Sequence, residues 1–419
     1  MSKDIEKTLL TLVLLEALDE EKDMPNRRGP TRGWIKRREE KGYYSNLVKE
    51  LRMEDTQGYK EMMRMNYNTF LLILQEIEQD ITVQELTNGG CKRIMPAERL
   101  TLTLRYLATG ESYSSLSFQF RISKRAISYI VQEVCSAISK NLMSVYLSVP
   151  KTEEEWMCIA DEFNERWNFP NAIGTIDGKH IILQRPFGGG SHFYNYKCTH
   201  SIVLMAIAGP NYECLYADIG ANGRCSDGGI WGNSRMSKCV EDNTLNIPAP
   251  RKLPNSDIAT PFVFLGDDAF ALKSYMMKPF PQRGLDVEKR IYNYRHSRAR
   301  RISEKLFGIL ASRWRVLRSA FLLQPKSVEN IIMAILILHN YLRRSSSVND
   351  YCPPDLIDSD IRGEFKSGSW REDCNGSNQS YLPLESQRGK TASNAKLVRE
   401  TLAKYFLDEG VVPWQWENC

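Results

Sequence analysis

The sequence has few of the residues that build zinc sites. Its ten cysteines are scattered without a single Cys-x-x-Cys pair, and only five histidines accompany them in 419 residues. Structural zinc needs closely spaced cysteines or histidines, so a zinc finger or zinc ribbon is excluded. Large apolar segments supply a core without disulfides, and we therefore expect reduced thiols in an intracellular compartment.

The sequence also lacks a segment that could span a membrane and several common catalytic motifs. Its longest apolar run, Ile331 to Leu338, is far shorter than the roughly 20 residues that a spanning helix needs. It contains no phosphate-binding P-loop, no dinucleotide-binding glycine motif after a strand, no His-Glu-x-x-His and no Gly-x-Ser-x-Gly. A membrane protein, a P-loop enzyme, a zinc protease and a serine hydrolase are thus disfavoured.

Size and charge indicate two domains with tails and leave a polyanionic partner open. A chain of 419 residues, 42% of them hydrophobic, exceeds one ordinary core, and its net charge of +5 is only mildly basic. Residues 1–58 are expected to form an N-terminal helix and a basic linker. The arginines and lysines within residues 25–42 fit a solvated hinge as well as an arm that contacts phosphates.

Residues 59–150 have the apolar spacing of helices and predict an all-α, helix-turn-helix-like domain. A helix that stops at Gly110 is followed by a short helix, a tight turn and a longer helix capped by Ser123. The longer helix would bury Ile127, Ile130, Val131, Val134 and Ile138. It would expose Lys124, Arg125, Ser128, Tyr129 and Gln132, of which Lys124 and Arg125 are the candidate DNA contacts.

From residue 151 the pattern changes to that of an α/β domain, which we expect to end at residue 345. After a helix over 152–168, apolar runs predict strands at 171–184, 199–208, 213–219 and 262–266. Helices are predicted at 271–278, 297–318 and 327–344. The tail, residues 346–419, is rich in Ser, Asp, Gly and Asn, so we predict it to be mostly disordered with a last helix at 393–407.

Two of the predicted strands carry an aspartate beside a glycine. Asp177 lies inside the apolar first strand, and Asp267 directly follows the fourth. A buried carboxylate is costly unless it is paired or bound to metal, and two that meet in one sheet repel each other unless a cation intervenes. Mg²⁺ and Mn²⁺ prefer oxygen ligands, so this pair predicts a divalent-metal site.

Two further acidic residues each allow a structural and a functional interpretation. Glu304 lies near the edge of the apolar face of its helix, where it either points into a cleft or pairs on the surface with Arg300 or Arg301. Asp227 follows the third strand, and it either caps the helix that begins there or joins the metal ligands. The residues alone leave both alternatives open.

The helix around Glu304 is strongly basic. Between residues 289 and 318 Glu304 is the only acidic residue among many arginines and lysines. A solvated face is the usual explanation of such a run, but a long uncompensated stripe also suits a phosphate backbone. Arg298, Arg300 and Arg301 are therefore candidate DNA contacts.

Several segments together resemble a known family. In order along the chain, GTIDGKHI, SDGGIWGNS, FLGDDAF, YNYRHSRARRISEKLFG and ILILHNYLRR are similar to the core of PIF/Harbinger transposases and of the nucleases derived from them. The helical segment LTLTLRYLATGESYSSLSFQFRISKRAISYIVQEV is similar to the region that precedes this core. The resemblance thus covers roughly residues 60–345 of the chain.

The resemblance implies a ribonuclease-H-like mixed sheet with flanking helices and an Asp-Asp-Glu triad that binds Mg²⁺ or Mn²⁺. Matched residue by residue, the catalytic and metal-binding triad is Asp177, Asp267 and Glu304, and Asp227 matches an acidic residue of the metal set. One position departs from the related insertion-sequence transposases, which have a basic residue seven positions after the glutamate. Here that residue is Ala311.

The function that the resemblance implies is cleavage of DNA phosphodiester bonds by metal-activated water, with strand transfer in a transposase. The alternative is a domesticated, catalytically silent protein that binds DNA or chromatin. Family members act with a Myb/SANT-like DNA-binding protein, so the helical domain is expected to contact either that partner or DNA. The expected location is the nucleus, with the cytoplasm as a second site. A homodimer stays open, as does the choice between a mobile-element enzyme and a host protein.

Overall fold

The computed structural model describes most of the chain. The described residues are 32–82, 93–186, 189, 191–345, 348–361, 363–374, 381–383 and 393–418. The helix expected over residues 1–24 and the first part of the basic linker lie outside them. No described helix has both the length and the apolar character needed to cross a membrane.

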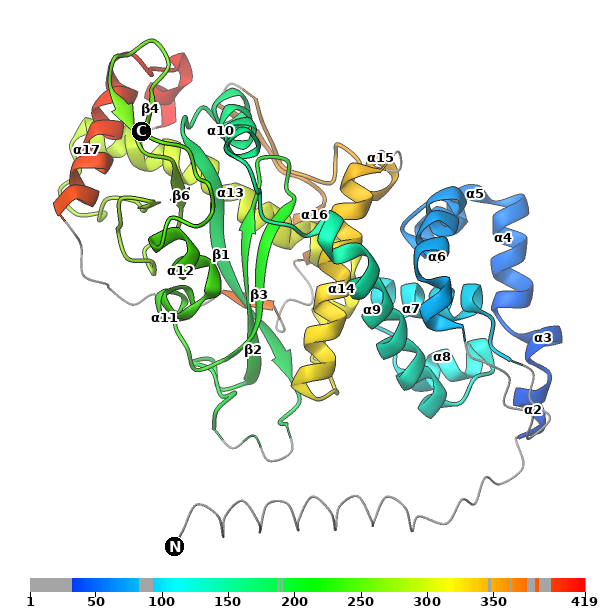
Figure 1. Ribbon diagram of the computed structural model, residues 1–419. Helices are drawn as coiled ribbons and strands as arrows, with labels where there is room; N and C mark the ends of the chain where they lie inside the picture. The colour runs from blue at the N-terminus through cyan, green and yellow to red at the C-terminus, as the bar shows by residue number, and fades with distance from the viewer. Residues whose placement is uncertain are drawn as a thin grey trace, which may run out of the picture.

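The first part of the described chain, residues 32–82 and 93–147, contains helices and no described strand, and is called the helical region below (Figure 1). Its elements are α2 (Gly33–Lys36), α3 (Arg38–Lys41), the π-helical turn η1 (Tyr44–Val48), α4 (Lys49–Glu54), α5 (Thr56–Met63), α6 (Tyr67–Ile81), α7 (Pro96–Thr109), α8 (Tyr113–Phe120) and α9 (Lys124–Tyr146). As predicted, α7 ends at Gly110, whose φ of 70° suits a residue without a side chain.

The helix α9 follows the prediction in its cap and in its buried face. The Ser123 side chain accepts a hydrogen bond from the Ala126 N–H, and the five apolar residues predicted to be inside are all buried. Gln132, however, is not free to read DNA, because its side chain exchanges hydrogen bonds with Asn330 and Ser327. This part of the prediction is wrong because α9 packs against a helix from the C-terminal half of the chain.

A mixed sheet lies at the centre of the second region, residues 151–345, which is called the α/β region below. Its described strands are ordered β3–β2–β1–β6–β7, and β10 also pairs with β1. β1, β2 and β3 form an antiparallel meander, whereas β6 and β7 run parallel to β1. The bounds are β1 (Ala172–Leu183), β2 (His200–Ala208), β3 (Cys214–Asn222), β6 (Val263–Leu265), β7 (Met276–Met277) and β10 (Tyr381–Pro383).

Helices cover both faces of this sheet (Figure 1). α13 (Val287–Arg313) and α14 (Pro325–Arg344) pack on one face, and α11 (Asp227–Asn233) and α12 (Arg235–Glu241) pack on the other. α10 (Glu153–Trp167) precedes the sheet and starts with a capping box between Thr152 and Glu155. The mixed α/β architecture expected from the sequence is therefore present.

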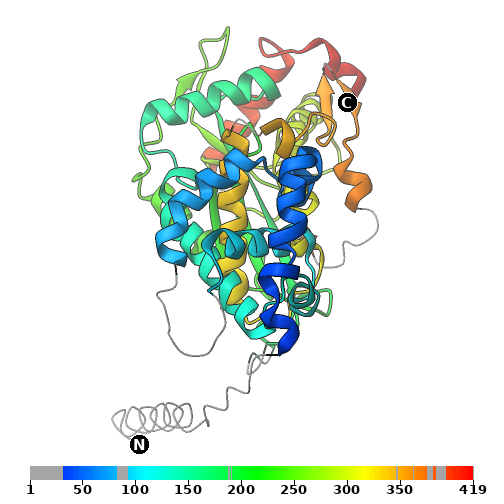
Figure 2. The ribbon, with the colours of Figure 1, turned by 90° about the vertical axis from the view of Figure 1, so that its right-hand side faces the viewer.

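The helical region and the α/β region share one core. The buried residues of α6, α7 and α9 belong to the same apolar cluster as those of α13 and α14. Figure 2, in which the helical region faces the viewer, shows α14 behind it. Because α14 contacts both α9 and β3, this helix connects the two regions.

The helix predicted at residues 271–278 is wrong. Met276 and Met277 form β7, paired with Phe264 and Leu265 of β6, and the residues before them form a turn. A short apolar run has no period that tells a strand from a buried helix, and only the neighbouring strand decides between them. Smaller pieces complete the region: the hairpin of β4 (Arg251–Lys252) and β5 (Ala259–Thr260), and the 3-10 turn η2 (Arg315–Arg318).

The tail is more ordered than predicted. The expectation of a mostly disordered tail is wrong for residues 348–361, 363–374 and 408–418, which fold onto the α/β region. Their elements are α15 (Val348–Tyr351), the β8 (Ser359–Ile361) and β9 (Glu364–Lys366) hairpin, α16 (Trp370–Cys374), α17 (Ser393–Leu407) and η3 (Pro413–Asn418). The helix predicted at 393–407 is α17, and its Phe406 packs on Phe169 and Tyr292.

Candidate carboxylate site

The sheet brings Asp177 and Asp267 to the same level of two neighbouring parallel strands. Thr175 of β1 is paired in register with Leu265, the last residue of β6; Asp177 lies two residues farther along β1, and Asp267 lies two residues beyond the end of β6. Side chains two residues apart point to the same side of a strand. Both carboxylates therefore face the side of the sheet on which α13 packs.

Near Asp177, the strand that pairs with β1 changes from β6 to β10. The strand pairs with β6 as far as Thr175 and with β10 from Lys179 onward. Asp177 falls between these two pairings, and on its other side it is paired with Ala206 of β2. The carboxylate is buried, and its Oδ1 accepts a hydrogen bond from the Gly178 N–H at 3.0 Å.

The two aspartates influence each other electrostatically. Burial and then the charge of Asp177 raise the pKa of Asp267 above its ordinary value, which means that a second negative charge is disfavoured there. The Ala269 N–H donates to Asp267 Oδ1 at 2.9 Å and fixes the orientation of the carboxylate. A bound cation would relieve this repulsion, as the sequence predicts.

The third acid, Glu304, lies on α13 and is held by an arginine. Arg300 Nη2 donates to Glu304 Oε1 at 2.5 Å, so the i,i+4 ion pair considered from the sequence is present. The charges of both aspartates also act on this arginine. Burial lowers the pKa of Arg300, but the charges of Asp177, Glu304 and Asp267 outweigh it and raise that pKa. The structure thus places all three acids around one guanidinium group.

A second cation faces the site from β1. Lys179 Nζ lies 3.5 Å from Asp177 Oδ2 and 5.5 Å from the centre of the Phe307 ring. Phe307 is buried on α13, one turn after Glu304. This contact packs the α13 face that carries Arg300 and Glu304 against the strand that carries Asp177. Lys179 is not among the predicted site residues, although it alternates with Asp177 along β1.

The fourth candidate, Asp227, begins α11. The capping position is Ser226, so the interpretation of Asp227 as a helix cap is wrong by one residue. The start of α11 lies against the loop that carries Asp267, because a Cβ atom on Gly228 would be 2.8 Å from the Ala269 carbonyl oxygen. Only a glycine permits this close approach, which brings the backbone at Asp227 near the carboxylate pair.

The described side chains do not yet form a complete metal cage. Among them, no group of three acidic, histidine or cysteine side chains is gathered closely enough to hold a metal ion. Asp177 and Asp267 supply adjacent oxygen ligands of the kind that Mg²⁺ or Mn²⁺ prefers, while Glu304 is engaged by Arg300. The three carboxylates fit a hard divalent ion once Glu304 is released from Arg300.

The prediction of a DNA-binding stripe on α13 is wrong for Arg298. Its guanidinium is buried, lies 3.3 Å from Asp360 Oδ1 and donates to Asn168 Oδ1 at 2.8 Å. Arg301 shares Asp360 at 3.2 Å and is half-buried. Arg300 is turned toward the carboxylates. The acids that compensate this helix come from the tail, which the sequence analysis expected to be disordered.

The other two candidate DNA contacts have the expected exposure. Lys124 and Arg125 are exposed on the first turn of α9, and the Arg125 guanidinium lies 5.9 Å from the ring of the exposed Tyr129. The segment of α2 and α3 lies beside this turn, because Arg121 donates to the carbonyl oxygens of Trp34 and Lys41. The helix-turn-helix role of α8 and α9 stays a prediction.

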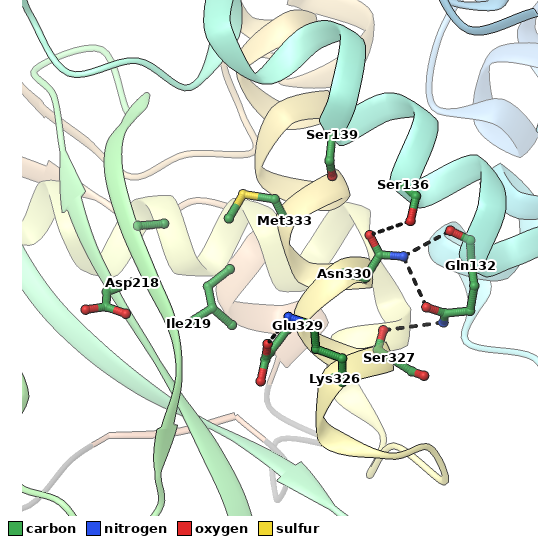
Figure 3. A pocket seen from close by; sticks show the side chains of 11 residues that line it. Gln132, Ser136, Ser139, Asp218, Ile219, Lys326, Ser327, Glu329, Asn330 and Met333 are labelled. Atoms are coloured by element: carbon green, nitrogen blue, oxygen red, sulfur yellow. Dashed lines mark hydrogen bonds and ion pairs between the residues drawn. The ribbon is translucent and has the colours of Figure 1, made fainter. Parts of the chain in front are cut away.

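Another acidic residue of the sheet, Asp218 of β3, lies in a different place. It lines a cavity of about 570 Å³ at the junction of α9, α14 and β3, together with polar residues such as Glu329 and Asn330. Figure 3 shows Ile219 pointing toward Met333 while Asp218 points to the other side of β3. Asp218 is paired in register with Met205, whose side chain belongs to the opposite face from Asp177. It does not join the carboxylate site.

Two buried histidines, His180 and His339, are core residues. His180 is buried against Ser201 Oγ at 2.9 Å, and burial lowers its pKa to about 4. His339 lies 2.9 Å from the Tyr351 hydroxyl and 2.8 Å from the Tyr212 carbonyl oxygen, and burial lowers its pKa to about 3. Both imidazoles are therefore neutral and have structural partners.

Comparison with known proteins identifies what the site resembles. Residues 176–340, which include all four acidic candidates, match the family described as DDE superfamily endonuclease. The chain is 24% identical over 295 residues to the ALP1-like protein of Arabidopsis thaliana, with 69% of this chain and 71% of that protein covered. It is 24% identical over 252 residues to HARBI1 of Bos taurus, whose name includes the word nuclease, with 59% and 68% covered.

A third relative has a name of another kind. The Arabidopsis thaliana protein called antagonist of like heterochromatin protein 1 is 22% identical over 323 residues, with 75% of this chain and 78% of that protein covered. No solved structure matches the chain.

Proposed function

Since the chain belongs to the DDE superfamily of endonucleases and is related to the Harbinger-derived nucleases, we propose that it cleaves DNA phosphodiester bonds with the help of Mg²⁺ or Mn²⁺. The observation that carries the proposal is the pair of Asp177 and Asp267 at one level of two parallel strands. The sheet order, with an antiparallel meander beside parallel strands, supports a ribonuclease-H-like fold.

The proposed residues have distinct roles. Asp177 and Asp267 would hold the metal from the sheet, Glu304 would complete the set from α13, and Asp227 would contribute from the start of α11. The bound metal would activate a water molecule and stabilise the leaving 3′ oxygen of the DNA. The backbone N–H groups of Gly178 and Ala269 hold the two aspartates in fixed orientations, which lowers the cost of ordering them when the ion binds.

The test is nicking of supercoiled plasmid DNA by the purified chain with Mg²⁺ or Mn²⁺. Asp177→Ala is expected to lower the nicking rate by about 10²–10³-fold or to background, because a transition-state electrostatic group is lost. Asp268→Ala is the matched control, since Asp268 is exposed beside Asp267 and is expected to be dispensable. Wild-type activity in Asp177→Ala, or equal losses in both variants, contradicts the assignment.

A second candidate function is a catalytically silent DNA-binding or chromatin protein, and the ion pair of Glu304 with Arg300 favours it. Such a protein would keep the fold and use the exposed basic surface at Lys124 and Arg125. It would bind DNA without nicking it and would not bind Mn²⁺ at the carboxylates, so the same assays separate the two functions. In either case we propose a nuclear location and a Myb/SANT-like partner for the helical region.

A further inference from the structure

Two neighbouring arginines of α13 have different surroundings. Arg300 pairs with Glu304 at 2.5 Å and faces Asp177 and Asp267, whereas Arg301 pairs with Asp360 of the tail at 3.2 Å. Both are arginines on one helix, one residue apart. They differ in that one neutralises the proposed metal ligands and the other neutralises a structural acid.

The ion pair of Arg300 is of a kind that opens easily. The side chains of Arg300 and Glu304 are 22% and 37% exposed, whereas those of Arg298 and Asp360 are 4% and 5% exposed. Breaking a partly exposed pair costs little because water replaces the lost contact, but breaking a buried pair leaves an uncompensated charge. Glu304 is thus held by a contact that a competing cation can replace.

The positions also explain why the described side chains lack a three-ligand cage. Asp177 and Asp267 are adjacent on the sheet, but the Glu304 carboxylate is bonded to a guanidinium group on its own helix. A guanidinium and a divalent ion both seek this carboxylate, and two cations in one small space repel each other. Binding of one must weaken binding of the other.

We propose that Arg300 is a placeholder cation, which holds Glu304 in the metal-free site and is displaced from it when a divalent ion binds. The inference rests on the proposed function, because it needs a metal at Asp177 and Asp267. Arg300 then sets the metal affinity of the site: it keeps the acids folded together without metal and makes the ion compete for its third ligand.

The first experiment measures Mn²⁺ binding by titration calorimetry on the full chain without DNA. Arg300→Gln is expected to bind Mn²⁺ roughly three- to tenfold more tightly than the wild type, because a repelling charge and a competing partner are removed. Arg300→Lys keeps the charge and is expected to stay close to the wild type. Arg301→Gln is the matched control and should leave the dissociation constant unchanged.

The outcomes separate the inference from the function. Equal or weaker Mn²⁺ binding by Arg300→Gln, with binding still abolished by Asp177→Asn, overturns the placeholder role and leaves the nuclease assignment standing. Absence of carboxylate-dependent Mn²⁺ binding in both the wild type and Arg300→Gln overturns both. Binding that appears only in Arg300→Gln supports the placeholder in its strongest form.

A second measurement uses the unaltered, folded protein. The side-chain Nε–H signals of arginine are followed by NMR during a titration with Mg²⁺, and Arg300→Lys and Arg301→Gln serve to assign them. The Arg300 signal is expected to shift as it leaves Glu304, while the Arg301 signal stays in place beside Asp360. An Arg300 signal that does not move while Mg²⁺ binds overturns the proposal, even if Arg300→Gln fails to fold.

Discussion

The first turn of α9 and the long helix α13 are both rich in basic residues, yet their surroundings are opposite. Lys124 and Arg125 are exposed on α9, whereas Arg298 and Lys305 of α13 are buried. Lys305 Nζ donates to the Asp358 carbonyl oxygen at 2.9 Å, and burial lowers its pKa to about 8. A basic run therefore does not indicate a DNA surface until the position of each residue around the helix is known.

The spacing of the basic residues explains the difference. On α13, Arg295, Arg298 and Lys305 continue the same alternating steps of three and four residues as Ile291 and Ile302. Residues at these steps lie on one face of a helix, and here that face is buried. On α9, Lys124 and Arg125 precede the first buried residue of the stripe, Ile127, and lie at the exposed end of the helix.

Among the substitutions that test this difference between α9 and α13, Arg298→Ala is expected to have the largest effect on stability. The substitution leaves Asp360 with only the half-buried Arg301 as a partner, and we expect a loss of about 3 kcal/mol in the free energy of unfolding. Arg125→Ala should change that free energy by less than about 0.5 kcal/mol. Urea unfolding of both variants provides the measurement. Equal stability of the two would mean that α13 is as solvated as α9.

Acidification is expected to destabilise the α/β region through its buried histidines. Burial lowers the pKa of His180 to about 4 and of His296 and His339 to about 3. The unfolded histidines titrate near about 6.5, so between that pH and the folded pKa the unfolded state binds more protons. Each group therefore removes ~1.4 kcal/mol of stability per pH unit as the pH falls through this window.

In the helical region, Glu98 changes stability with pH in the opposite direction to the histidines. Burial raises the pKa of Glu98 to about 7, and its charge is only partly relieved by Arg38. Between the ordinary carboxyl pKa and about 7, the folded state then binds more protons than the unfolded state. Glu98 therefore lowers the stability of the protein as the pH rises through this range. Glu98→Gln should make the acid-induced loss of stability steeper. A pH series of urea unfolding that is flat from pH 7 to 4 would contradict both assignments.

The smallest effect on stability, and the largest on DNA, is expected for Lys124→Ala combined with Arg125→Ala. If each side chain contacts one phosphate, a plot of the logarithm of the DNA-binding constant against the logarithm of the salt concentration becomes less steep by about two units. Thermal stability should remain that of the wild type. The matched variant Arg301→Ala should leave the salt slope unchanged. Fluorescence anisotropy at several salt concentrations measures this slope for each variant. An unaltered slope would exclude α9 as the DNA surface.

Local patterns predicted much of the fold. The cap at Ser123, the stop at Gly110 and the buried stripe of α9 follow from residues within one or two turns of each other. The four predicted strands correspond to β1, β2, β3 and β6 because each has enough apolar residues in sequence, although β3 continues to Asn222, beyond its predicted end at residue 219. Asp177 and Asp267 were identified for the same reason, since a lone acid in an apolar strand stands out.

The rest depends on contacts between distant segments. β7 has two residues and β10 has three, and each is a strand only because a neighbour pairs with it. The partner of Arg298 is Asp360, 62 residues later in a segment of polar composition. Glu304 lies among the acids, but its bond to Arg300 could equally have been a surface pair, and the spacing alone does not distinguish the two.

The strand β10 has a consequence for where this protein can be divided. The family match ends at residue 340, but β10 at residues 381–383 pairs with β1 just beyond Asp177. A chain cut after Arg344 would lose that strand, the Asp360 carboxylate that pairs with Arg298 and Arg301, and the Asp358 carbonyl oxygen that accepts from Lys305. The smallest autonomous unit is therefore larger than the matched segment. The segment that follows the family match is thus part of the sheet and of the packing around α13.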